Sequence, residues 1–283
     1  MIFFSSGGES DKSSVQTVQT FLDNGINNIE LSGGIYEESH LDKLLKLENK
    51  SNFLIHNYFP PPKEPFVFNL GSLNKSTIKK SLSHAKEAID YASALKSPTY
   101  SFHAGFLIDP DVKELGKKIK PKELYPKKES MTVFIENVNL LSDYAYEKKI
   151  DLLVENNVLS KNNSNIFPSN PLLMTDLEDT LKIMSETPAN VNLLVDLAHL
   201  KVSSNTQSFS CEEYLKKVDS WIRGYHMSDN NGLSDTNNKI TNDSWFWKEL
   251  NKDIEFFTIE VYGLNITEIK EQINLVQDKI CQK

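Results

Sequence analysis

Short apolar runs recur along the chain and predict eight buried strands. Between them, apolar residues recur at the spacing of an amphipathic helix, as at Ile78, Leu82 and Ala85 within 77–95. The predicted strands cover 2–6, 27–33, 52–58, 99–105, 151–157, 192–198, 222–228 and 256–262. The other predicted helices cover 14–25, 39–48, 130–148, 176–186, 211–219, 244–250 and 266–280.

This alternation of strand and helix predicts an α/β fold, a single (β/α)8 TIM barrel that takes up residues 1–283 as one domain. No linker rich in proline, glycine and serine divides the chain. An open, doubly wound sheet is the alternative. After the first strand, the segment SSGGES (5–10) has neither the glycine spacing of a dinucleotide-binding loop nor that of a P-loop.

Ionisable residues stand at the C-terminal ends of seven predicted strands, which is where such a barrel carries its chemistry. One such residue is usually a structural hydrogen-bonding group, but several carboxylates gathered at one mouth repel each other unless a cation neutralises them. Imidazole and carboxylate ligands together suit zinc, manganese, cobalt or iron(II) better than calcium. The pattern therefore favours a divalent metal site over a purely structural polar network. The residues are Glu30, His56, His103, Glu155, Asp196, His226 and Glu260, with His199 and Asp229 just beyond a strand end.

The composition narrows the class of protein further. A formal net charge of -8 argues against a general nucleic-acid-binding surface, which needs lysine and arginine to neutralise phosphates. Cys211 and Cys281 form neither a metal-spaced pair nor a disulfide framework. The chain shows no signal peptide and no apolar run of about 18 residues, so we expect a cytoplasmic protein that does not bind membranes.

Four segments occur in an order that resembles the xylose-isomerase-like barrel superfamily, which includes sugar isomerases, ketose 3-epimerases and the endonuclease IV family. They are VENN (154–157), VDLAH (195–199), RGYHMSDNNG (223–232) and TIEVYG (258–263). The resemblance implies a metal site of Glu155, Asp196, His226 and Glu260 for one divalent ion (manganese, zinc, cobalt or magnesium), with a second ion left open. It also implies a sugar or sugar-phosphate isomerase or epimerase, in which Glu155 and Glu260 transfer a proton through an enediolate. His199 would then contact the substrate.

Endonuclease IV relatives, which cleave abasic DNA with three zinc ions, are the alternative. Their additional histidines are matched by His56, His103 and His199, and FVFNLGS (66–72) is similar to a segment of that family. Their third zinc needs an Asp-x-His pair, whereas Asp235 is followed here by Asn237, which has no imidazole nitrogen. Asp229 and Asp235 stay open as second-metal or substrate-binding groups. With the acidic net charge, nucleic acid is the less favoured partner, and a sugar-binding barrel without catalysis is a third alternative.

Two loops bear on the choice of substrate, for which we expect a small carbohydrate, with phosphorylated and nucleotide-linked sugars included. The ketose epimerases carry an arginine shortly after the strand-7 histidine, which MSDNNGLSD (227–235) lacks, so we expect a substrate other than theirs. Tyr58 and Phe59, in a proline-rich loop, either pack on a sugar or a base or only fill space. Lys117, Lys118 and Lys120, in the lysine-rich segment 111–128, either form a cationic lid or a solvated surface. The sequence is compatible with a homo-oligomer.

Overall fold

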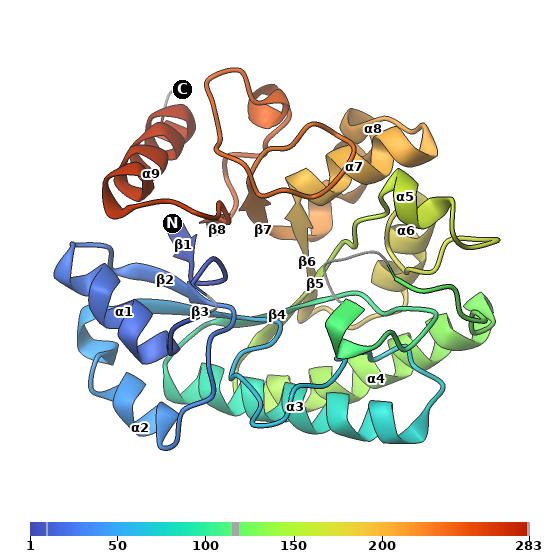
Figure 1. The fold of residues 1–283 in the computed structure, drawn as a ribbon, viewed down its shortest axis with the longest axis horizontal. Coiled ribbons are helices and arrows are strands. Elements are labelled where there is room, and N and C mark those ends of the chain that lie inside the picture. The colour runs from blue at the N-terminus through green and yellow to red at the C-terminus, as the bar shows by residue number, and fades with distance from the viewer. Residues whose placement is uncertain (10, 115–118, 282–283) are drawn as a thin grey trace.

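Parallel strands form a closed barrel in the computed structural model, which describes residues 1–9, 11–114 and 119–281 (Figure 1). Each strand pairs with the next along the chain, and β8 pairs with β1. This confirms the predicted (β/α)8 barrel and excludes an open, doubly wound sheet. The strands are β1 (Ile2–Ser5), β2 (Asn28–Leu31), β3 (Asn52–His56), β4 (Thr99–His103), β5 (Asp151–Glu155), β6 (Val191–Asp196), β7 (Ile222–Met227) and β8 (Phe256–Ile259).

Helices surround the strands, as Figure 1 shows. None of those described is both long and apolar enough to cross a membrane. The α-helices are α1 (Ser14–Asp23), α2 (His40–Leu45), α3 (Lys75–Ala94), α4 (Lys127–Glu147), α5 (Lys161–Ser164), α6 (Leu177–Ser185), α7 (Leu197–Gln207), α8 (Cys211–Val218) and α9 (Ile266–Cys281). The short 3-10 helices are η1 (Glu48–Lys50), η2 (Val112–Glu114), η3 (Asp219–Trp221) and η4 (Trp245–Lys248).

The structure corrects the sequence-based prediction at η4 and at α7, and it adds the four-residue α5, which was not predicted. The helix predicted at 244–250 is only η4, where Phe246 is completely buried and the Trp247 indole donates to the Thr241 carbonyl at 2.7 Å. These tertiary contacts outweigh the helical pattern of a short aromatic segment. The helix α7 was not predicted, because its apolar residues continue the apolar run of β6 with only Asp196 between them.

The inside of the barrel changes from apolar to polar side chains along the strands. Phe3, Leu54 and Phe256 form an apolar cluster. Successive side chains on a strand point to opposite faces, so the residues two positions later share the same inner face. Two positions after Leu54, β3 carries His56, and two positions after Phe256, β8 carries Thr258. The lower barrel is therefore packed with apolar side chains, while polar side chains gather at the C-terminal ends of the strands.

Candidate metal centre

Four side chains from β5, β6, β7 and the end of β8 meet inside the upper barrel. Glu155, Asp196, His226 and Glu260 each offer a ligand atom, and these atoms all lie within 4.8 Å of one another. His226 Nδ1 lies 3.0 Å from Glu155 Oε1 and 3.0 Å from Glu260 Oε2. We call these residues the four-residue group. They are the residues for which the sequence resemblance implied a metal site, and the fold brings them together.

A second set of possible ligands shares Glu155 with the four-residue group. His56, His103 and Glu155 again place ligand atoms within 4.8 Å of one another. Glu155 Oε2 lies 3.4 Å from His56 Nε2 and 3.1 Å from His103 Nδ1, while its Oε1 faces His226. The other nitrogen of His56, Nδ1, lies 3.0 Å from the Ser101 hydroxyl. Glu155 therefore joins the two sets through its two different oxygens.

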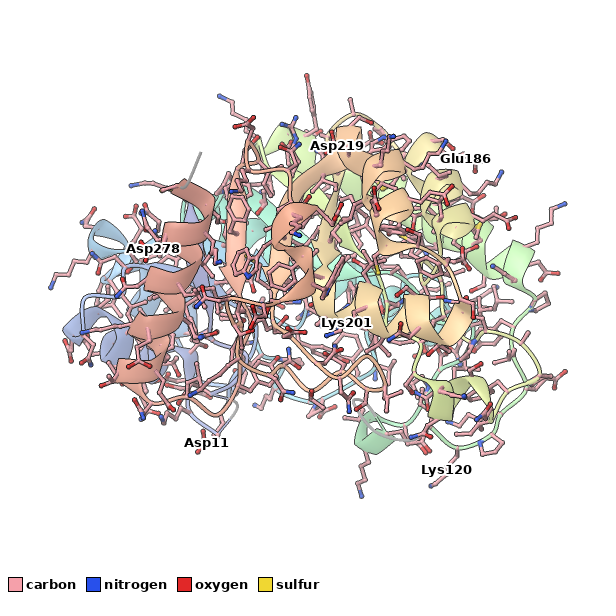
Figure 2. All side chains as sticks on the ribbon, turned by 90° about the horizontal axis from the view of Figure 1, so that it is seen from above. Asp11, Lys120, Glu186, Lys201, Asp219 and Asp278 are labelled. Carbon is pink, nitrogen blue, oxygen red and sulfur yellow. The ribbon has the colours of Figure 1, made fainter. Side chains whose placement is uncertain are left out.

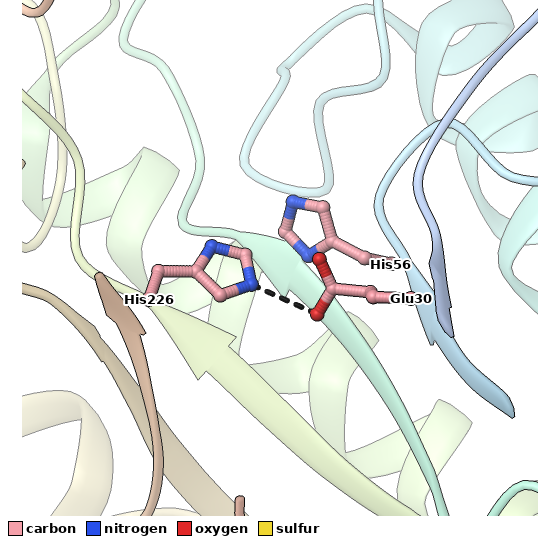
Figure 3. Close-up of side chains that lie close together, drawn as sticks. All are labelled: Glu30, His56 and His226. Atoms are coloured by element: carbon pink, nitrogen blue, oxygen red, sulfur yellow. Dashed lines mark hydrogen bonds and ion pairs between the residues drawn. The ribbon is translucent and has the colours of Figure 1, made fainter. Parts of the chain in front are cut away.

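Glu30, which the sequence placed among the strand-end candidates but which the resemblance did not include in its metal site, completes a third set with His56 and His226. Its Oε2 lies 2.9 Å from His226 Nε2, and the Thr258 hydroxyl donates to the same oxygen at 3.3 Å. In Figure 3, Glu30 and His226 point toward each other from different strands, with His56 beside them.

The carboxylates and imidazoles of the site shift one another's pKa values. Burial raises the pKa of Glu155, but the adjacent His103, His226 and His56 outweigh burial and hold it well below its ordinary value. The pKa of Glu260 is likewise lowered to about 2, because His226 outweighs the effect of burial. Burial lowers the pKa of His226, but Glu30, Glu155 and Glu260 raise it well above the ordinary value. Glu155 and Glu260 are therefore ionised at neutral pH.

Asp196 ends β6 and caps α7 at the same time. Its Oδ1 accepts the His199 backbone N–H at 2.6 Å, which is the interaction of an N-cap. Asn156 holds Asp196 on its other side: the Asn156 Oδ1 accepts the Asp196 N–H at 2.8 Å, and its Nδ2 donates to the Asp196 carbonyl at 3.1 Å. Burial raises the pKa of Asp196 to about 7, although His199 opposes the shift. Asn156 lies in the VENN segment, yet its role depends on a contact that the sequence did not reveal.

His199 is engaged by the protein through both ring nitrogens. Its Nδ1 lies 2.9 Å from the Asn156 carbonyl, to which it donates, and its Nε2 lies 3.2 Å from Asp235 Oδ2. Among the described residues, neither His199 nor Asp235 belongs to a potential metal-binding group. Burial lowers the pKa of His199, but Asp196 and Asp235 raise it well above its usual value.

Several buried oxygens in the site have no hydrogen-bond donor. A buried carboxylate oxygen without a donor is costly, unless a cation neutralises it. A donor set of imidazole nitrogens and carboxylate oxygens suits a divalent transition metal. The described residues therefore fit a divalent metal ion. Of the oxygens concerned, Glu155 Oε2 and Asp196 Oδ2 belong to the four-residue group, whereas Glu30 Oε1 and Asp235 Oδ1 lie outside it.

Two polar residues that follow β7 have structural partners. The Lys201 ammonium lies 2.7 Å from Asp229 Oδ1, and the Ser244 hydroxyl donates to Asp229 Oδ2 at 2.7 Å, so this carboxylate is already neutralised. Asn237, which stands where a third zinc would need a histidine, donates from Nδ2 to the Glu260 carbonyl at 3.1 Å. It supports the backbone that carries Glu260.

The proline-rich loop after β3 is packed into the fold. Phe59 has no exposed surface and its ring packs against His40 and Tyr91, so of the two alternatives that the sequence left open, this ring fills space. The Tyr58 hydroxyl accepts the Phe68 N–H at 2.8 Å, and its ring packs on Phe66, Phe68 and His84. These aromatics fill space beneath the loop.

The lysine-rich segment 111–128 is described only in part, and Lys117 and Lys118 lie outside the described residues. Lys120 lies at the outer edge of the molecule in Figure 2, with 77% of its side chain exposed and Glu114 at 3.9 Å. Lys122 donates to the Asp109 carbonyl at 3.0 Å, and Lys127 lies 2.6 Å from Asp179 Oδ1. The contacts of these three lysines are those of a solvated surface and of local ion pairs.

Comparison with known proteins identifies a family model, described as a xylose isomerase-like TIM barrel, which matches residues 18–258. No curated protein matches the chain. A D-tagatose 3-epimerase-like protein is 19% identical over 99% of this chain and 99% of that chain, with a TM-score of 0.70. A D-psicose 3-epimerase from Clostridium cellulolyticum H10, solved with D-tagatose, is 12% identical over 99% of this chain and 93% of that chain, with a TM-score of 0.65.

A protein from Thermus thermophilus, soaked with ZnCl2, has a similar structure as well. It is 15% identical over 98% of this chain and 98% of that chain, with a TM-score of 0.65. At these identities, the three solved structures show a shared fold, and the chemistry has to be argued from the residues of this chain.

Proposed function

Since the chain belongs to the xylose isomerase-like TIM barrel family, we propose that it is a divalent-metal-dependent isomerase or epimerase of a sugar or sugar phosphate. The observation that carries the proposal is the four-residue group, which gathers three carboxylates and one imidazole inside the mouth of the barrel. Solved structures of the same fold include a D-psicose 3-epimerase with D-tagatose, which supports a sugar as the substrate class.

Glu155, Asp196, His226 and Glu260 would hold the ion. A divalent cation bound there polarises the carbonyl and hydroxyl oxygens of a sugar and so acidifies the neighbouring C–H bond. Glu155 and Glu260 reach the site from β5 and from the end of β8, and both are ionised at neutral pH. Each carboxylate is therefore in the form that removes a proton, and each returns one when it acts as the acid.

Glu260 is the better placed of the two to meet a substrate. Its side chain is 11% exposed, whereas Glu155 has no exposed surface. The Tyr262 hydroxyl donates to Glu260 Oε1 at 2.7 Å and leaves Oε2 facing His226. We assign proton abstraction to Glu260 and assign to Glu155 the role of linking the two ligand sets.

The mouth of the barrel offers further polar groups to a sugar. Of the site side chains, His103 is 27% exposed and Asp235 is 24% exposed, while His199 is nearly buried behind them. An exposed imidazole and carboxylate can hydrogen-bond sugar hydroxyls and select their orientation. We assign His103 and Asp235 to substrate binding, with His199 orienting Asp235.

A specific observation favours a second candidate function, hydrolysis of a phosphoester by two metal ions. His56 and His103 form a ligand set that shares Glu155 with the four-residue group. Paired metal ions bridged by a shared carboxylate are typical of enzymes that cleave phosphoesters. The net charge of -8 disfavours DNA as the phosphoester, and Asn237 removes the third zinc ligand of the endonuclease IV pattern.

An activity panel separates the two functions. Metal-free protein is reloaded with zinc, manganese, cobalt or magnesium and incubated with ketoses, aldoses, their phosphates and an abasic-site DNA duplex. We expect a new sugar isomer or epimer that disappears with a chelator and with Glu260→Gln, while Glu87→Gln, an exposed carboxylate on α3, keeps the activity. Cleavage of the DNA without sugar interconversion would favour the second candidate, and binding of sugar without turnover would indicate a non-catalytic barrel.

A further inference from the structure

We propose that Glu30 is the positioning residue for His226, holding the imidazole with Nε2 protonated so that Nδ1 is turned to the metal ligands. This role rests on the proposed metal site. Glu30 itself is not one of the ligands in this assignment. It acts through His226, from the opposite side of the ring.

The two nitrogens of His226 face different partners. Nε2 lies 2.9 Å from Glu30 Oε2, and Nδ1 lies 3.0 Å from both Glu155 Oε1 and Glu260 Oε2. Carboxylates only accept hydrogen bonds, and they face both ring nitrogens, so each proton of an imidazolium has a partner here. A cation held by Glu155 and Glu260 would take the place of the Nδ1 proton, and Glu30 would then keep the tautomer with the proton on Nε2. That tautomer leaves the Nδ1 lone pair directed at the four-residue group. Figure 3 shows the His226–Glu30 interaction directly.

Glu30 is held rigidly enough for this task. It lies on β2 with 1% of its surface exposed, and β2 pairs with β1 through the register Ser5↔Glu30. The Thr258 hydroxyl donates at 3.3 Å to the same Oε2 that faces His226. The Ser6 backbone N–H donates to the Glu30 carbonyl at 2.8 Å. The carboxylate is thus fixed by strand pairing and by a neighbouring hydroxyl.

The alternative is that Glu30 binds an ion of its own together with His56 and His226, since the three have ligand atoms within 4.8 Å. The orientation of His56 argues against this. Its Nδ1 faces the Ser101 hydroxyl at 3.0 Å and its Nε2 faces Glu155 Oε2 at 3.4 Å. An ion bound to Glu30 would also displace the proton that links Glu30 to His226.

A carboxylate that accepts a hydrogen bond from the other ring nitrogen of a metal-bound histidine affects the metal affinity. It fixes the ring and increases its basicity, and its loss typically weakens metal binding about 10–100-fold. The test uses Glu30→Gln, which keeps the shape of the side chain but removes its charge. Thr258→Val removes the supporting hydroxyl at almost constant volume. Asp179→Asn, a buried carboxylate on α6 paired with Lys127, is the matched control.

Zinc affinity and stoichiometry are measured by chelator competition on the full chain, with the visible spectrum of the cobalt form as a second readout. We expect Glu30→Gln to bind zinc about 10–100-fold more weakly with the same number of ions, and to shift the cobalt bands. Thr258→Val should change the zinc affinity and the cobalt bands in the same direction but by less, and Asp179→Asn should match the wild type in both readouts. A merely structural role for Glu30 would not move the cobalt spectrum.

Long-range 1H–15N spectra of the zinc form report the tautomer directly. We expect the proton of His226 on Nε2 in the wild type, with a changed Nε2–H signal in Glu30→Gln. Unchanged affinity and spectrum in Glu30→Gln would overturn the proposal, as would the loss of one bound ion, which would make Glu30 a ligand. If Glu30→Gln does not fold, the Thr258→Val affinity decides. A wild type that binds no ion at all would instead overturn the proposed function, and the role of Glu30 with it.

Discussion

Replacing Glu155 by glutamine removes one charge from the point where the two ligand sets meet. Glu155 Oε1 lies 3.0 Å from His226, and Oε2 lies 3.1 Å from His103 and 3.4 Å from His56. Losing a partner behind a metal ligand weakens binding about 10–100-fold, so losing a shared direct ligand should cost at least the upper end of that range. We therefore expect Glu155→Gln to bind a divalent ion at least about 100-fold more weakly than the wild type.

The weaker affinity converts to a difference in melting temperature. An ion at about 100 times its Kd stabilises a protein by about 2.7 kcal/mol. For 283 residues, an unfolding entropy of about 2.1 cal/mol/K per residue gives about 0.6 kcal/mol/K, and hence a rise in Tm of about 5 °C. At the same ion concentration, a protein whose site is 100-fold weaker is stabilised by only about 0.4 kcal/mol. This corresponds to a rise in Tm of less than about 1 °C.

Scanning calorimetry of metal-free protein, with and without zinc or manganese, makes the comparison within each variant. This cancels any effect of the substitution on the metal-free fold. Glu87→Gln, on the outer face of α3, should keep the full gain of the wild type. A gain in Tm for Glu155→Gln as large as that of the wild type would show that Glu155 does not hold the ion.

Three further predictions concern the surroundings of the site. Burial lowers the pKa of His84 to about 4, so the unfolded state binds more protons than the folded state between about pH 6.5 and pH 4. The free energy of unfolding therefore falls as the pH falls through this window. Urea unfolding should show a free energy of unfolding about 2 kcal/mol lower at pH 5 than at pH 7.5 in the wild type, a loss that His84→Gln lacks. Tyr262→Phe removes the hydrogen bond to Glu260 Oε1 and should lower kcat about tenfold at unchanged metal content, so an unchanged kcat would argue against Glu260 as the proton carrier. Lys120→Ala should leave KM for a sugar phosphate unchanged, because this side chain points to solvent. A salt-dependent rise in KM would instead support the cationic lid.

The period of the apolar pattern was enough to predict every strand of the barrel, because buried parallel strands leave a clear signal in the sequence. The start of α7 was hidden for a physical reason. Asp196 both ends β6 and caps α7, so strand and helix join in one apolar run without a loop between them. At η4, the helical pattern was present, but the packing of Phe246 and Trp247 decided the local structure.

The candidate ligands could be identified because strand ends converge in a barrel, so position along each strand was sufficient. The role of Glu30 could not, because its partner His226 is 196 residues away and faces it across the barrel. The role of Phe59 could not be predicted from the sequence either. An aromatic residue in a proline-rich loop after a barrel strand is equally compatible with a substrate rim and with the core, and only the packing on His40 and Tyr91 distinguishes the two.

Transfer of solvent hydrogen into the substrate tests the central claim most directly. The metal-loaded protein is incubated in D2O with the panel of sugars and sugar phosphates, and the products are examined by NMR and mass spectrometry. Proton transfer by Glu260 predicts deuterium at the carbon beside the carbonyl of one substrate, and predicts that the signal is lost with a chelator and with Glu260→Gln. Interconversion of a sugar without deuterium, or exchange that persists in metal-free protein, would contradict the account.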